Sequence, residues 1–190
     1  MMNLIKLLSL NTPRSFRHML TSFVQAPFNA NAWQMPINSA LGPLTLVASH
    51  KGLCGVWFDD QAHRPDLSHL PWGSSHHWLR LAKSQLNDYF AGKRSSFDIP
   101  LDLVSGSDFQ RRVWRALLAI PYGRYSTYGE LAQHLGQAKA ARAVGAAVGR
   151  NPLSIIIPCH RVVGANGALT GYSGGMWRKL DLLQREGTLL

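Results

Sequence analysis

Hydrophobic residues between positions 33 and 58 occur in short runs, which are fully apolar or alternate with polar residues, and turn residues separate the runs. This pattern is typical of an antiparallel β-meander, because successive side chains of a strand point to opposite faces of a sheet. We expect strands at Trp33 to Ile37, Leu44 to Ala48 and Leu53 to Phe58.

The hydrophobic pattern then changes to a helical period. From Ser75 to Phe90 apolar residues recur three or four positions apart, and Gly92 closes the stretch. This spacing predicts one amphipathic helix that covers the meander. Residues 93–106 are rich in serine, proline and glycine, and they predict a linker that contains one strand at Ile99 to Val104.

Two capping signatures open helices in the second half of the chain. Ser107 is followed three residues later by Gln110, and Thr127 is followed in the same way by Glu130. A run of small residues over 138–149 predicts a further helix. The two short helices after Thr127, joined by a glycine-containing turn, resemble a helix-turn-helix.

An apolar run from Leu153 to Ile157 leads directly to Pro158, Cys159, His160 and Arg161. The β-branched run predicts a strand, and the proline fixes a tight turn after it. Cationic side chains beside a sulfur lower the thiol pKa and populate the nucleophilic thiolate, so the pattern indicates a reactive cysteine. A structural cysteine fits these few residues as well, because neighbours on a strand point to opposite faces.

Charge is divided unevenly along the chain. Residues 1–108 hold nine basic and seven acidic side chains, whereas residues 109–190 hold eleven and three. Such a cationic C-terminal part suits a polyanionic partner such as nucleic acid, with a merely basic surface as the alternative. No apolar run reaches the roughly 18 residues that span a bilayer, so we expect no contact with a membrane.

Two cysteines are too few for a disulfide scaffold and favour a reducing compartment. Cys54 falls inside a predicted strand, where we interpret it as structural. The histidines between positions 63 and 77 share no ligand spacing with a cysteine pair, so we expect no metal site. Residues 1–32 contain no carboxylate and resemble a weak transit peptide, but they lack a long apolar segment and are interpreted as a dispensable extension.

Residues 151–175, NPLSIIIPCHRVVGANGALTGYSGG, followed by RKLDLLQREG, resemble the active-site signature of the O6-alkylguanine-DNA alkyltransferases, also called methylated-DNA–protein-cysteine methyltransferases. The resemblance extends upstream and covers 82 residues in one register, from Phe109 to the last residue. The N-terminal part is similar to the divergent domain of this family only in its size and in its pattern of a meander plus a helix.

The patterns and the resemblance together predict an α/β (α+β) fold in four segments. They are an extension at 1–32, an N-terminal domain with a β-meander and a helix at 33–92, a linker at 93–106, and a C-terminal domain at 107–190. The C-terminal domain is expected to be mainly helical, with the helix-turn-helix and the active-site cysteine turn.

The resemblance implies the catalytic roles of five residues. Cys159 is the alkyl acceptor, His160 is its general base acting through a water, and Glu186 completes the relay by orienting the imidazole. Asn151 braces the turn before the cysteine. Tyr128 donates a proton to the guanine ring, although without the resemblance it would be interpreted as a core aromatic residue.

The resemblance also implies how substrate and DNA are bound. Tyr172 and Ser173, in the glycine-flanked loop TGYSGG, form the wall of the base pocket. The alkylated base must leave the duplex stack, and Arg142 fills the position that it vacates. The other DNA-contacting residues, on a helix whose small side chains allow close approach to the minor groove, are Ala141, Lys139 and Gly145.

The sequence therefore predicts a single-turnover DNA repair protein. It would bind duplex DNA that contains O6-methylguanine, with O4-methylthymine as a second substrate, and would transfer the alkyl group irreversibly to Cys159. We expect a cytoplasmic monomer, associated with the nucleoid if the source is bacterial, that uses no cofactor and no metal. The alternatives are a cysteine–histidine hydrolase and a non-catalytic helix-turn-helix DNA-binding protein.

Overall fold

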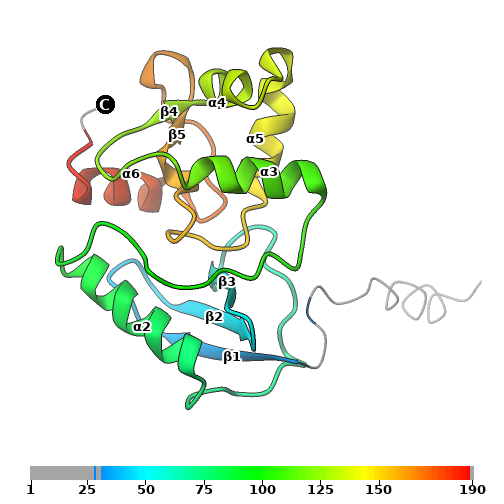
Figure 1. Cartoon of the computed structure of the whole chain (residues 1–190). Coiled ribbons are helices and arrows are strands. Elements are labelled where there is room, and N and C mark those ends of the chain that lie inside the picture. The colour runs from blue at the N-terminus through cyan, green and yellow to red at the C-terminus, as the bar shows by residue number, and fades with distance from the viewer. Residues whose placement is uncertain (1–27, 29–30, 189–190) are drawn as a thin grey trace, which may run out of the picture.

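The computed structural model describes residue 28 and residues 31–188 of the chain. Figure 1 shows two parts, one built on a three-stranded sheet with a helix and the other a group of short helices. The predicted mixed α/β fold is therefore confirmed. Most of the extension predicted at 1–32 lies outside the described residues. Within the described part of the chain, no helix has the length and apolar character needed to cross a membrane.

The N-terminal part is built on an antiparallel sheet with the strand order β1-β2-β3. The strands are β1 (Ala32–Ile37), β2 (Leu44–Ser49) and β3 (Leu53–Phe58), whose ends lie within one residue of the predicted ones. The turn from β1 to β2 contains Gly42 at a φ of 102°, a conformation that glycine adopts at the lowest cost. The predicted meander is confirmed.

Helix α2 (His77–Phe90) packs across this sheet and begins two residues later than predicted. Its apolar stripe is buried, and Leu79, Ala82 and Leu86 are fully enclosed. Burying a leucine side chain contributes about 1.5–3 kcal/mol, so this stripe accounts for the attachment of the helix. Tyr89 continues the stripe and is 4% exposed.

Both edges of the sheet are met by short segments that begin with a proline. In each contact an edge residue donates its N–H to the proline carbonyl, and its own carbonyl accepts the N–H two residues further on, at N···O distances of 2.8–2.9 Å. Each contact is an isolated parallel bridge. The three pairs are Gln34 with Pro71–Gly73, Leu53 with Pro100–Asp102, and Val56 with Pro152–Ser154.

The strands predicted at Ile99 to Val104 and Leu153 to Ile157 are both wrong, because each segment forms only one such bridge. After the first bridge the N–H of Val104 turns back to Asp102. After the second, the N–H of Ile157 turns back to Leu153, and Ile155 has a φ of 73°. That left-handed conformation is rare for a β-branched residue and ends any extended pairing.

The C-terminal part is mainly helical, as predicted. Both capping boxes are present. The side chains of Ser107 and Thr127 each accept the backbone N–H three residues further on, and the side chains of Gln110 and Glu130 accept the backbone N–H of the capping residue. The α-helices are α3 (Asp108–Leu117), α4 (Tyr128–His134), α5 (Ala141–Gly149) and α6 (Met176–Arg185).

The helix predicted over 138–149 is divided into two elements. A 3-10 turn, η3 (Ala138–Ala140), precedes α5, and the turn after α4 passes through Gly136 at a φ of 70°. Helices α4 and α5 pack on each other, as expected for a helix-turn-helix. The remaining short elements are β4 (Ser126–Thr127), η4 (Cys159–Arg161), β5 (Val162–Val163) and η5 (Ala165–Gly167), and β4 pairs with β5 in parallel.

The two parts share one hydrophobic core. A single cluster of buried residues includes Val56 and Phe58 of β3 together with Leu153 and Ile157 before η4. The segment that leads to Cys159 is therefore fixed by the sheet of the N-terminal part as well as by the helices of its own part.

Candidate active site

The cysteine turn is buried at the boundary between the two parts. Cys159, His160 and Arg161 form the 3-10 turn η4 and are 7%, 0% and 7% exposed. Pro152, seven residues before the cysteine, accepts the N–H of Val56 in β3. The N-terminal sheet thus helps to set the position of the sulfur.

Asn151 holds this turn from inside. Its side-chain oxygen accepts the N–H of Leu153 at 3.0 Å, and its side-chain nitrogen donates to the carbonyl of Ile157 at 2.8 Å. The same nitrogen lies 2.9 Å from Sγ of Cys159. Asn151 therefore occupies the position expected for a brace and, in addition, points a donor at the sulfur, which favours the charged thiolate.

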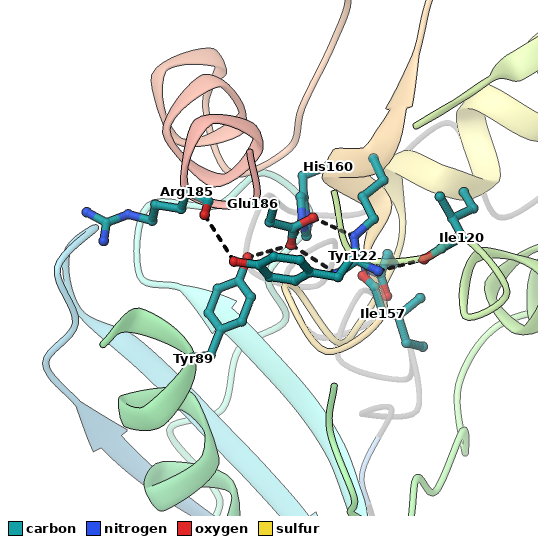
Figure 2. A network of polar contacts seen from close by, with 9 residues as sticks. Tyr89, Ile120, Tyr122, Ile157, His160, Arg185 and Glu186 are labelled. Carbon is teal, nitrogen blue, oxygen red and sulfur yellow. Dashed lines mark hydrogen bonds and ion pairs between the residues drawn. The ribbon is translucent and has the colours of Figure 1, made fainter. Parts of the chain in front are cut away.

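Behind the turn, the Glu186 carboxylate collects donors from three side chains (Figure 2). Oε1 lies 2.9 Å from Nε2 of His160, and Arg161 donates to both oxygens, at 2.8 Å from Nε and 2.9 Å from Nη2. The Tyr89 hydroxyl donates to Oε1 at 2.7 Å. The predicted pair of His160 and Glu186 is thus brought together, within a larger network.

The proton positions on His160 follow from this network. An ionised carboxylate only accepts hydrogen bonds, so Nε2 of His160 carries the proton that points at Glu186. In the neutral imidazole Nδ1 is then the acceptor. This nitrogen is buried and makes no hydrogen bond with another described residue. It is therefore the atom of the ring that can receive a proton.

The pKa values correct one expectation from the sequence. Burial raises the pKa of the Cys159 thiol, against the lowering effects of Asn151 and of the Lys179 charge. The cationic side chains next to the sulfur do not lower it, because His160 and Arg161 both direct their donors at Glu186. Cys159 is accordingly a neutral thiol at neutral pH and needs a base.

The partners of the thiol titrate differently. Burial lowers the pKa of His160 most strongly, so the imidazole is neutral and able to act as that base. Burial would raise the pKa of Glu186, but hydrogen bonds from His160 and Arg161 lower it to about 2. Glu186 is therefore ionised at any physiological pH.

A cavity of about 280 Å³ opens onto the sulfur. Four other predicted site residues line it with Cys159: the predicted proton donor Tyr128, the predicted pocket residues Tyr172 and Ser173, and Gly145, which was predicted to contact DNA. The Ser173 hydroxyl donates to the carbonyl of Gly149, which fixes that side of the rim. A larger cavity of about 810 Å³ has Pro158 and Arg161 among its lining residues and does not include the sulfur.

The other predicted DNA-contacting residues lie on the outside of the helix-turn-helix. Lys139 and Arg142 are exposed, and Ala141 is half-buried. The Arg142 side chain makes no hydrogen bond or ion pair with another described residue, so its guanidinium is available to a ligand. In the described part of the chain, no three His, Cys, Asp or Glu side chains gather as metal ligands do.

The sequence did not reveal the site contacts of three residues. Tyr89 belongs to the apolar stripe of α2, and this stripe carries no sign of a polar partner 97 residues away. Arg161 appears in the sequence as a neighbour of the sulfur rather than of Glu186. Lys179 is fully buried and donates to the carbonyls of Val162 and Thr170, and a lysine within a helix predicts no such burial.

Comparisons with known proteins agree with this arrangement. A family model described as 6-O-methylguanine DNA methyltransferase, DNA binding domain, matches residues 108–188. A second, described as 6-O-methylguanine DNA methyltransferase, ribonuclease-like domain, matches residues 36–103. The methylated-DNA–protein-cysteine methyltransferase of Mycobacterium tuberculosis is 50% identical over 150 residues, which are 79% of this chain and 89% of that protein.

A second relative and a solved structure give the same result. The methylated-DNA–protein-cysteine methyltransferase of Methanosarcina acetivorans is 46% identical over 150 residues, covering 79% of this chain and 95% of that protein. The crystal structure of Mycobacterium tuberculosis OGT in complex with DNA superimposes with a TM-score of 0.73 and 49% identity. That match covers 80% of this chain and 91% of the other.

Proposed function

Since the chain belongs to the 6-O-methylguanine DNA methyltransferase family, we propose that it repairs duplex DNA by moving an alkyl group from a damaged base onto its own Cys159. One observation carries this proposal. The Cys159 sulfur lines a cavity beside Tyr128 and Tyr172, while the adjacent His160 is bonded to an ionised carboxylate. The substrate is O6-methylguanine in DNA, with O4-methylthymine as the second.

In the proposed reaction the sulfur forms a bond to the alkyl carbon as the bond from that carbon to O6 breaks. The thiol proton passes through a water to Nδ1 of His160, and Glu186 stabilises the resulting imidazolium. The electron pair of the broken bond stays on guanine, whose ring takes a proton from Tyr128. The imidazolium then gives its proton to water and the Tyr128 phenolate takes one up, so that overall a thiol and an alkylguanine become a thioether and guanine with no net gain or loss of protons.

The contacts of Asn151 and Tyr128 fit this chemistry. The Asn151 nitrogen, 2.9 Å from Sγ, stabilises the charge that develops on sulfur as the proton leaves. Burial raises the pKa of Tyr128, so its hydroxyl keeps its proton until the departing base needs it. A thioether has no easy reverse reaction, and each molecule therefore acts once.

The cavity can receive a base only after that base has left the duplex. Unstacking costs a few kcal/mol, and contacts that hold the opened duplex must offset it. Arg142 fills the vacated position, while Lys139, Ala141 and Gly145 let α5 approach the minor groove. Tyr172 and Ser173 hold the base against the sulfur. We propose that a monomer does this, in the cytoplasm and at the nucleoid if the source is bacterial.

Mass spectrometry tests the proposal directly. After mixing with a duplex oligonucleotide that contains O6-methylguanine, the tryptic peptide Asn151 to Arg161 should gain one methyl group in place of one hydrogen, at one equivalent per protein. Methyl on Cys54 instead would contradict the assignment. Repeated turnover would favour a different enzyme class, and binding without transfer would favour a DNA-binding protein without catalysis.

A further inference from the structure

We propose that Tyr89 of α2 is a positioning residue for alkyl transfer, because its hydroxyl orients Glu186 and withdraws charge from the oxygen that faces His160. This inference rests on the proposed function, since it concerns the base of the same reaction. It assigns to the N-terminal part a direct influence on the proton affinity of a group in the C-terminal part. Figure 2 shows Tyr89 reaching from α2 toward the carboxylate.

The two oxygens of Glu186 accept different numbers of hydrogen bonds. Oε1 accepts from Tyr89 at 2.7 Å, from Nη2 of Arg161 at 2.9 Å and from Nε2 of His160 at 2.9 Å, whereas Oε2 accepts from Nε of Arg161 at 2.8 Å. A carboxylate oxygen has two lone pairs, so three donors on Oε1 compete for its charge. The bond to His160 is therefore weaker than it would be without the tyrosine hydroxyl.

Packing leaves the Tyr89 hydroxyl little choice of direction. The ring is 4% exposed and contacts the rings of Phe90, Phe97 and Tyr122, with centroids 5.6, 5.5 and 6.3 Å away. A phenylalanine at position 89 would keep these contacts. The hydrogen bond is buried, where the low dielectric makes it stronger than at a surface.

The direction of the expected effect follows from the charges around His160. Glu186 raises the pKa of His160, while burial, Arg161 and Lys179 lower it. Removing the Tyr89 hydroxyl leaves Arg161 and Lys179 in place and increases the negative charge on Oε1 of Glu186. The imidazole should then hold a proton more tightly. The neutral base should appear only at a higher pH, although the nearby Cys159 thiol remains protonated throughout.

Tyr122 offers a matched control. Its hydroxyl donates to the backbone carbonyl of Arg185 at 3.0 Å and not to Glu186, and its ring lies 5.8 Å from the Arg161 guanidinium. Tyr122→Phe therefore removes a hydroxyl from the same cluster of rings without removing a donor from the carboxylate.

The test is the pH dependence of the transfer rate in the full-length chain, measured by quenched mixing with an O6-methylguanine duplex. Tyr89→Phe should move the acidic limb of the profile upward by about half to one pH unit and slow transfer about three- to tenfold below it. Tyr122→Phe should leave the limb unchanged. An unmoved limb in Tyr89→Phe, or the same shift in both variants, would overturn the proposal.

A second measurement separates this inference from the proposed function. The 15N chemical shifts of the His160 ring, recorded against pH without DNA, give the midpoint of its titration. This midpoint should lie at a higher pH in Tyr89→Phe than in the wild type, even if no methyl transfer occurs. Should that variant fail to fold, 3,5-difluorotyrosine at position 89 keeps the ring and strengthens the donor. It should move the His160 titration to lower pH, and identical titrations with tyrosine and difluorotyrosine would refute the role.

Discussion

The two cysteines lie in regions that are equally buried and chemically different. Cys54 in β3 is 1% exposed and Cys159 in η4 is 7% exposed, and burial raises the pKa of both, that of Cys54 to about 12. Neither accessibility nor acidity therefore distinguishes the thiol that we propose to react from the one that we interpret as structural.

The distinction lies in the polar groups around each sulfur. Cys54 packs in an apolar cluster with Phe28, Trp57 and Leu67, and its thiol donates to the carbonyl of Val47 at 3.5 Å. Its proton has an acceptor, and although backbone hydrogen bonds at Ser49 and Cys54 lower the pKa of this thiol, burial and the charge of Asp102 outweigh them. Around Cys159 a donor points at the sulfur and a neutral imidazole follows in the chain, so charge on the sulfur can form during the reaction.

The largest expected effect comes from replacing each of the two cysteines in turn. Cys159→Ser should abolish methyl transfer and retain DNA binding, because Arg142 and the basic surface are unchanged. Cys54→Ala should transfer methyl at the wild-type rate and lose about 1 kcal/mol of stability. Transfer assays together with DNA titrations measure both. Loss of DNA binding in Cys159→Ser would mean that this cysteine is structural too.

The charged network should make the Cys159 region acid-sensitive. Glu186, with a pKa lowered to about 2, stabilises the fold fully above its ordinary pKa of 4.5, and this contribution is lost as pH falls from 4.5 toward 2. Glu186→Gln should lower the free energy of unfolding by about 3–5 kcal/mol at pH 7, because Arg161 is left buried and unpaired.

Urea unfolding at pH 7 and pH 3.5 measures this dependence. The gap between wild type and Glu186→Gln should narrow at the lower pH. A gap of equal size at both pH values would show that the ionisation of Glu186 does not stabilise the fold.

A smaller effect is expected from replacing Asn151, whose side chain donates to the sulfur of Cys159. Asn151→Ala removes the hydrogen bond to Sγ, so transfer should slow about 10- to 100-fold, the range for a bond to a developing charge. The rate of reaction of Cys159 with a small alkylating reagent at fixed pH should fall in parallel. If only the DNA reaction slowed, Asn151 would act on the position of the base and not on the sulfur.

The smallest effects are expected from Tyr128→Phe and Arg142→Ala, which distinguish alkyl transfer at Cys159 from extrusion of the base out of the duplex. Tyr128→Phe should slow both repair of duplex DNA and reaction with free O6-benzylguanine about tenfold, because a donor to the departing base is lost. Arg142→Ala should slow only the duplex reaction, since the free base needs no extrusion. Rate constants for both variants on both substrates provide the check. Equal slowing by Arg142→Ala on the free base would make that arginine structural.

Local rules predicted those elements that depend on local contacts. The capping boxes at Ser107 and Thr127 are formed within four residues, and the meander is set by alternation along each strand. The strand predicted from Leu153 to Ile157 did not form, because the apolar character of that run reflects burial between two parts and not pairing. Periodicity cannot distinguish these two causes.

The candidate site, too, could be predicted only in part from the sequence. The motif around Cys159 allowed the pair of His160 and Glu186 to be predicted by resemblance, and the structure brings them within 2.9 Å. The pKa of the sulfur could not be predicted, because it depends first on how deeply the fold buries Cys159. Tyr89 could not be found either, since a tyrosine in an apolar helical stripe is ordinarily a packing residue.

The proline-led segments at the edges of the sheet have a consequence for behaviour at high concentration. An open strand edge is a template on which a second chain can pair and aggregate. Here Gln34 of β1 and both Leu53 and Val56 of β3 already exchange hydrogen bonds with Pro71–Gly73, Pro100–Asp102 and Pro152–Ser154. Each of these segments forms a single bridge and not a strand, so it offers no continuous edge to a further chain, and we expect the contacts to protect the folded protein against assembly into fibrils.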